Sequence, residues 1–185
     1  MPKDQVEKRK ATGVLDYLSL ALTTFGVGYM PLAPGTWGSL LAVAFYAALS
    51  NGFGSYRYTP SLAPPEATVA AIHAVILVGL GLFILIGIWA AERSIALLGN
   101  TDPPQAVVDE VIGQLVVFLF IPFTHSWLLI IAGFLLFRLF DIWKPYPINK
   151  LQDLSGGIGV CADDIAAGIY AGVLLSVCHA ITLYL

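Results

Sequence analysis

The sequence predicts an all-α protein, a polytopic membrane bundle of about five transmembrane helices plus an N-terminal interfacial or re-entrant helix. Hydrophobic residues make up 58% of the 185 residues and charged residues only 11%, whereas a soluble domain carries about 25% charged residues. The charges are also segregated, because four long runs contain no Asp, Glu, Lys or Arg: residues 17–56, 67–91, 111–137 and 165–185. Each run reaches the roughly 20 residues that a helix needs to cross a bilayer.

The N-terminal segment differs from the rest in composition. Residues 1–12 contain four basic side chains and no apolar run, and we expect them to form a flexible cytoplasmic arm. Residues 13–185 are expected to form a single transmembrane domain, because the length suits one compact bundle.

The first apolar run is interrupted. Residues 14–26 predict the interfacial or re-entrant helix, and two prolines and three glycines at residues 28–39 end it. A short first span follows at residues 36–50, with Gly35 or Thr36 as its N-cap.

The middle of the chain alternates between loops and spans. Residues 51–66 are rich in Gly, Pro, Ser and Tyr and predict a loop, and residues 68–91 predict the second span. Residues 92–104 predict a polar connection, because the prolines at its end disfavour a helix.

The run 111–137 has two interpretations. Its 27 residues suit one tilted helix, but Pro122 and the polar residues 124–126 favour a hairpin of two spans, residues 106–121 and 126–142. A last span covers residues 163–184.

The Lys and Arg residues orient these five spans. The arm, Arg93 and the basic residues of the 138–162 connection fall on one face, while the other face has only Arg57. Because cytoplasmic loops are enriched in Lys and Arg, the N-terminus is expected inside and the C-terminus outside. Every acidic pair then lies at the cytoplasmic face.

Five carboxylates at the ends of predicted spans are the strongest candidates for chemistry: Asp109, Glu110, Asp141, Asp163 and Asp164. Charged side chains at the ends of membrane spans cost free energy and are often functional. Mg²⁺ prefers carboxylate, water and phosphate oxygens as ligands. We therefore expect these five as catalytic and metal-binding residues. The alternative is that they are solvated charges favoured by helix dipoles at N-termini.

Basic and backbone groups on the same face could hold a phosphate. Arg138, Asp141 and Lys144 are spaced i, i+3, i+6 and predict one helical stripe, in which Arg138 and Lys144 bind phosphate oxygens. The alternative is a membrane anchor whose long side chains extend to the interface. The Gly35-Thr36 turn and Ser39 would add N–H and hydroxyl donors at a helix N-terminus.

Other chemistries have less support. The three histidines are scattered and predict packing residues: His73, His125 and His179. Cys161 and Cys178 have no metal-like spacing and no phosphatase loop, and no basic stripe indicates nucleic acid. A metal-activated water is the mechanism that these residues favour.

Three blocks together resemble the phosphatidylglycerophosphatase A family. They are residues 26–40, residues 102–113, and a third block from residue 137 through the Gly-Gly-Ile-Gly of 156–159 to residue 168. Their order and spacing match the family pattern across about residues 14–180. One departure is Cys161, where the family often has Met.

The resemblance implies a Mg²⁺-dependent enzyme of bacterial phospholipid synthesis in the inner membrane. Such an enzyme removes the terminal phosphate of phosphatidylglycerol phosphate, its lipid substrate, to give phosphatidylglycerol and inorganic phosphate. The family's acidic motif positions fall here on Asp109, Glu110, Asp141, Asp163 and Asp164.

Two other functions use some of the same features. A CDP-alcohol phosphotransferase also uses aspartates at the membrane face, but it places them at four-residue spacings that this chain lacks. A small channel or transporter would place charges near the bilayer midplane, whereas these lie at span ends.

Overall fold

The computed structural model describes the backbone of residues 5–58, 66–121 and 126–184, and the side chains of these residues except 53–58, 182 and 184. This part of the chain is all-helical, as predicted, with an isolated β-bridge between Gln5 and Asn100. The helices are α1 (Val14–Thr24), η1 (Val27–Tyr29), α2 (Pro34–Tyr58), α3 (Glu66–Leu98), α4 (Val108–Val117), η3 (Phe118–Phe120), α5 (Trp127–Trp143), α6 (Ile148–Leu151) and α7 (Gly156–Tyr184).

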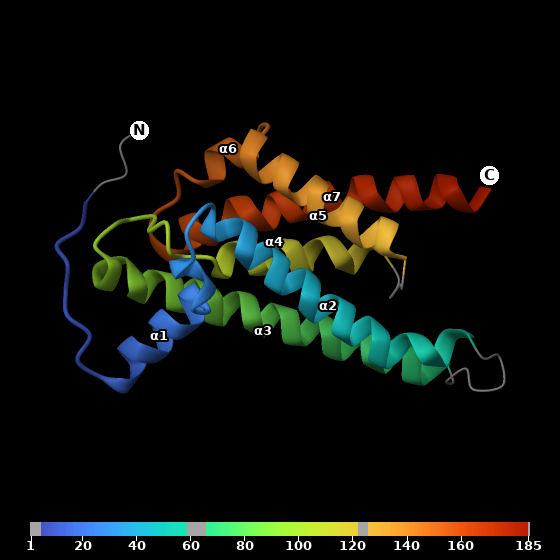
Figure 1. Cartoon of the computed structure of the whole chain (residues 1–185), viewed down its shortest axis with the longest axis horizontal. Coiled ribbons are helices and arrows are strands. Elements are labelled where there is room, and N and C mark those ends of the chain that lie inside the picture. The colour runs from blue at the N-terminus through green and yellow to red at the C-terminus, as the bar shows by residue number, and fades with distance from the viewer. Residues whose placement is uncertain (1–4, 59–65, 122–125, 185) are drawn as a thin grey trace.

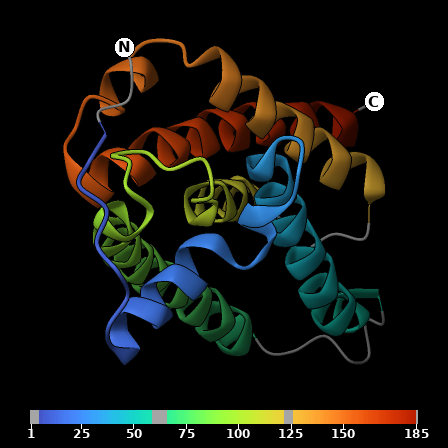
Figure 2. The same ribbon diagram turned by 60° about the vertical axis from the view of Figure 1, so that its left-hand side comes forward.

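Helix α4 lies at the centre of the bundle. It packs against α7, α2, α3 and α5, and Figures 1 and 2 show these longer helices arranged around it. Its side chains are buried on every face, including Val108, Ile112 and Val117. Most of its side chains are apolar, as expected for a central helix, and Asp109 and Gln114 are buried with them. The first turn of α4 therefore lies in the interior of the bundle.

Two of the described helices are long and apolar enough to cross a membrane. They are Glu66–Leu98, with 33 residues, and Gly156–Ile181, with 26 residues. Helix α4 has 10 residues, or about 15 Å, and does not cross a bilayer by itself. The number of five spans therefore stays a prediction.

The run 111–137 forms two separate helices, as the hairpin interpretation predicts, although their crossing of the membrane stays a prediction. Helix α4 continues into η3, and α5 starts separately at Trp127. Pro122 and His125 lie outside the described residues.

Three predicted boundaries were wrong. Helix α2 continues past Ser50 to Tyr58, and α3 continues past Ala91 to Leu98. Glycines inside a helix cost only about 1 kcal/mol each, so Gly52 and Gly54 do not stop α2.

The third correction concerns α7, which begins at Gly156, seven residues before the predicted start. Gly156 takes a left-handed φ of 67°, and the Gly157 N–H donates to Glu92 Oε2 over 2.5 Å. The glycine-rich segment is thus the first turn of a helix that α3 caps.

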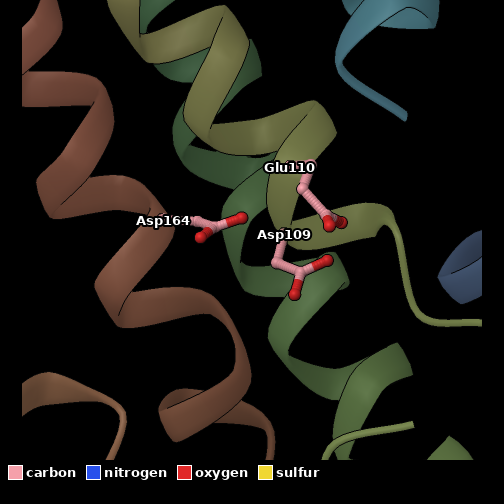
Figure 3. A group of neighbouring side chains, drawn as sticks. All are labelled: Asp109, Glu110 and Asp164. Atoms are coloured by element: carbon pink, nitrogen blue, oxygen red, sulfur yellow. The ribbon is translucent and has the colours of Figure 1, made fainter. Parts of the chain in front are cut away.

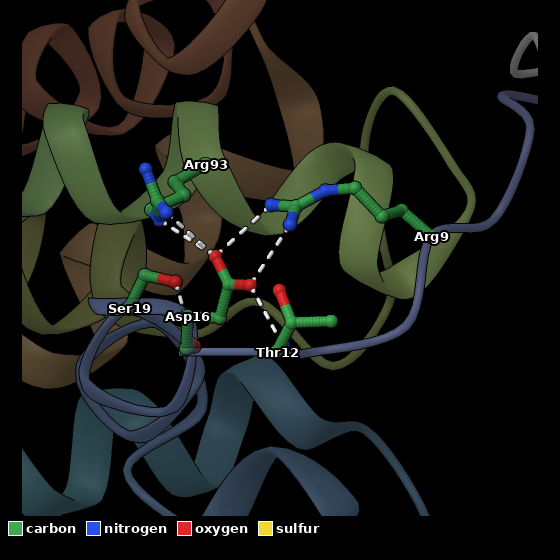
Figure 4. A network of polar contacts seen from close by, with 5 residues as sticks. All are labelled: Arg9, Thr12, Asp16, Ser19 and Arg93. Atoms are coloured by element: carbon green, nitrogen blue, oxygen red, sulfur yellow. Dashed lines mark hydrogen bonds and ion pairs between the residues drawn. The ribbon is translucent and has the colours of Figure 1, made fainter. Parts of the chain in front are cut away.

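The N-terminal segment is anchored by Asp16, which is 1% exposed. Figure 4 shows Arg9 and Arg93 donating to its carboxylate, with closest distances of 2.8 Å, while the Thr12 N–H donates over 3.0 Å. The hydrogen bonds from Arg9 and Thr12 hold the pKa of Asp16 well below its ordinary value. Residues 5–12 therefore have defined contacts, and the flexibility of the predicted arm stays untested.

Candidate active site

Three carboxylates meet where α4 and α7 pack together. Asp109 and Glu110 belong to the first turn of α4, and Asp164 projects from α7 (Figure 3). Their ligand oxygens all lie within 4.8 Å of one another. Asp109 and Asp164 are buried, at 9% and 4% exposure, which differs from the solvated charges of the alternative interpretation.

The cluster has unsatisfied oxygens. Asp109 Oδ1 and Glu110 Oε2 are buried and accept no hydrogen bond from the described residues. Two ionised carboxylates 4.8 Å apart repel by roughly 3.5 kcal/mol at an effective dielectric constant of about 20. A buried acidic cluster of this kind needs a cation or protons to be stable.

The two other predicted carboxylates are paired with bases. Arg138 Nη1 lies 2.8 Å from Asp141 Oδ2, and Lys144 Nζ donates to Asp163 Oδ2 over 2.5 Å. The five acids therefore divide into a cluster of three and two ion pairs beside it.

The predicted helical stripe does not include Lys144. Helix α5 ends at Trp143, and Lys144 is its C-cap in a left-handed conformation with φ 45°. This turn directs Lys144 towards α7. Burial lowers the pKa of Lys144, but the Asp163 ion pair and the nearby Asp164 and Asp141 outweigh it and raise the pKa above its ordinary value, so Lys144 keeps its positive charge.

The predicted phosphate turn lies against the cluster. Gly35 is buried in the first turn of α2, and a side chain there would collide with the Glu110 carboxylate. Thr36 is half-buried, whereas Ser39 is fully buried and its hydroxyl donates to the Gly35 carbonyl over 3.0 Å. The backbone of Gly35 and Thr36 is therefore placed near the cluster, and the Ser39 proton is already used.

The described histidines lie far from the acids. His179 is 15 residues after Asp164 in α7, about 22 Å along the axis. His73 is 14 residues before Gly87, where α3 packs against Val108 of α4, or about 21 Å along the axis. Cys161 is buried in the apolar core and Cys178 is exposed.

Two buried or capping residues of these helices were not predicted from the sequence. Glu92, which caps α7, was assigned to a polar connection. Gln114 is 0% exposed, and both of its side-chain amide atoms lack a partner among the described residues. It follows Glu110 by four residues, so the two share one face of α4, and this spacing was the signal available.

A helical fold with two helices long enough to cross a membrane, and an acidic cluster flanked by Arg138 and Lys144, indicates an integral membrane enzyme that acts on phosphate esters. The family model described as Phosphatidylglycerophosphatase A matches residues 20–179, and the chain belongs to this family.

Curated relatives agree with this assignment. A protein of Escherichia coli named Phosphatidylglycerophosphatase A is 33% identical over 157 residues, which cover 84% of this chain and 80% of the relative. Its namesake in Haemophilus influenzae is 32% identical over 167 residues, covering 90% and 91%. A Bacteroides thetaiotaomicron protein named Putative phosphatidylinositol-3-phosphatase is 39% identical over 156 residues, covering 84% and 89%.

The chain is therefore an enzyme, a phosphatase of phospholipid metabolism. No solved structure matches it.

Proposed function

We propose that the enzyme hydrolyses the terminal phosphate of phosphatidylglycerol phosphate, with Mg²⁺ as cofactor, at the cytoplasmic face of a bacterial inner membrane. The observation that carries the proposal is the buried cluster of Asp109, Glu110 and Asp164, whose oxygens lie within 4.8 Å of one another.

The donor set fits Mg²⁺. The cluster supplies carboxylate oxygens, the hard ligands that Mg²⁺ prefers, and two of these oxygens are buried without a partner among the described residues. Asp109, Glu110 and Asp164 would hold the ion. When bound, Mg²⁺ lowers the pKa of water and offsets phosphate charge.

Basic side chains position the substrate phosphate. Arg138 offers a planar pair of donors to phosphate oxygens and Lys144 a point charge. Asp141 and Asp163 orient these two bases through the ion pairs already described. The backbone of Gly35, at the start of α2, lies beside Glu110 and would add an N–H donor, whereas the Thr36 N–H already donates to the Ala33 carbonyl over 3.0 Å.

The reaction is a hydrolysis. A water oxygen forms a bond to phosphorus, the ester P–O bond breaks, and the lipid alcohol leaves with a proton. The carboxylates of the cluster are the groups placed to take the proton from water, and the charges of Arg138 and Lys144 stabilise the phosphate as the bond breaks.

The orientation in the membrane rests on the distribution of charge. The cluster lies at the same end of the bundle as the N-terminal segment and the connection between α5 and α7 (Figure 1). Residues 5–12, Arg93 and residues 138–150 hold seven of the eight Lys and Arg residues in the described part of the chain, all but Arg57. This distribution supports a cytoplasmic site. A cysteine at Gln152 should accordingly react with a label added from the cytoplasmic side.

A second substrate follows from one comparison. The relative from Bacteroides thetaiotaomicron carries the name of a phosphatidylinositol-3-phosphatase, so a phosphoinositide is the competing lipid. The headgroups differ, whereas both reactions release inorganic phosphate from a phosphomonoester.

Phosphate release from each lipid in detergent tests the proposal. We expect a higher kcat/KM for phosphatidylglycerol phosphate than for phosphatidylinositol 3-phosphate, and release lowered by orders of magnitude with Asp164→Asn. A higher kcat/KM for phosphatidylinositol 3-phosphate would show that this lipid, and not phosphatidylglycerol phosphate, is the substrate. A CDP-alcohol phosphotransferase or a channel would release phosphate from neither.

A further inference from the structure

An apolar cavity of about 530 Å³ opens between α2, α3 and α4. Fourteen residues line it, and they are apolar apart from the Tyr46 hydroxyl. Tyr46 is 5% exposed and stacks on Phe118, with ring centroids 4.0 Å apart. Such a cavity offers water few hydrogen bonds and suits an apolar ligand, and its volume lies within the range of small-molecule sites.

The cavity begins close to the active site on two helices. On α4, its first lining residue is Val111, directly after Glu110. On α2, its first lining residue is Leu41, six residues after Gly35, or about 9 Å along the axis. The apolar lining therefore begins within about two helical turns of the cluster, a distance that the apolar part of a lipid can span.

The third wall belongs to a candidate membrane span. This wall is part of α3, whose span covers Glu66–Leu98, and its lining residues are Ile76, Gly79, Leu80 and Phe83. Figure 2 shows α2 and α3 on either side of α4 rather than packed together, and in the described residues these two helices make few direct contacts. The cavity is thus reached from the side on which lipid chains lie.

We propose that this cavity binds one acyl chain of the phospholipid substrate and so holds the headgroup phosphate at the acidic cluster. The proposal rests on the proposed function, because it needs a substrate that is both a phosphomonoester and a lipid. The chain is bound by burial of its methylene groups. The enzyme should therefore discriminate acylated from deacylated substrates at this site.

Two glycines of α3 provide a matched test. Gly79 lines the cavity, and Gly81, two residues later, does not. A Cβ added at either position meets nothing within 4 Å. Gly79→Phe therefore fills the cavity without a clash at Cβ, and Gly81→Phe makes the same change outside it.

The two variants are compared on long-chain phosphatidylglycerol phosphate and on its deacylated, water-soluble analogue. We expect Gly79→Phe to lower kcat/KM for the lipid about tenfold, the factor for exclusion of two methylene groups. It should leave the soluble analogue unchanged, and Gly81→Phe should leave both unchanged. Equal effects of the two variants on the lipid would overturn the proposal.

A second readout does not depend on turnover. Phosphatidylglycerol phosphate with a diazirine in its acyl chain should cross-link to the α2 and α3 segments that line the cavity, even in excess phosphatidylcholine. Gly79→Phe should abolish this cross-link and Gly81→Phe should keep it. Equal labelling by a phosphatidylcholine probe would show a bulk membrane lipid there and overturn the proposal. A wild-type enzyme that releases no phosphate from any lipid would instead contradict the proposed function.

Discussion

The Glu110 carboxylate lies directly against the α-carbon of Gly35, so that even a methyl group at residue 35 would collide with it. This contact joins the start of α2 to the acidic cluster. A side chain at residue 35 could be accommodated only if the Glu110 carboxylate moved from its position in the cluster.

Gly35→Ala should therefore displace Glu110 and lower kcat/KM by about two orders of magnitude, the cost of misplacing a catalytic group by about 1 Å. Gly52→Ala is the matched control, because it lies in the same helix with nothing within 4 Å of its added Cβ. The activity of both variants is measured as phosphate release from phosphatidylglycerol phosphate. Normal activity of Gly35→Ala would show that Glu110 needs no fixed position.

Asp164→Asn should lower turnover by orders of magnitude, since it removes one charge from the proposed Mg²⁺ site. The same change relieves repulsion among buried carboxylates, so the melting temperature in EDTA should rise or hold steady. If Asp164 served only to stabilise the fold, Asp164→Asn would lower the melting temperature. Asp153→Asn, on an exposed residue, and His179→Ala should keep both properties close to wild type.

Much of this site could be expected from the sequence, because charges are rare in the chain and apolar runs mark its spans. The pairs Asp109-Glu110 and Asp163-Asp164 were found for that reason. The separation of the five acids into a cluster of three and two ion pairs was not predictable. It depends on the left-handed turn at Lys144, which brings the Lys144 side chain to Asp163. The early start of α7 was missed because its cap, Glu92, comes from another helix.

Arg138→Lys tests how the phosphate is held. Lysine keeps the charge but loses the planar pair of donors, so kcat/KM should fall about tenfold or more, the scale of one charge-assisted hydrogen bond. Lys150→Arg, on an exposed residue of α6, should have no effect. Equal activity of Arg138→Lys and wild type would mean that Arg138 is only an anchor for Asp141.

Asp16→Asn tests the network that joins the N-terminal segment to α3. The folded-state pKa of Asp16 lies below its unfolded value, which is about 3.9. Its stabilising effect is therefore complete above that value and is lost as the pH falls towards the folded pKa. The melting temperature of Asp16→Asn should lie below wild type at pH 7, and the difference should shrink below about pH 4. A difference that is independent of pH would argue against the charge of Asp16.

The most direct test of the central claim is phosphate release from phosphatidylglycerol phosphate by purified enzyme, first in EDTA and then after addition of Mg²⁺. The cluster of Asp109, Glu110 and Asp164 predicts no release in EDTA and full recovery with Mg²⁺ in excess. Undiminished turnover in EDTA would contradict the metal-dependent mechanism.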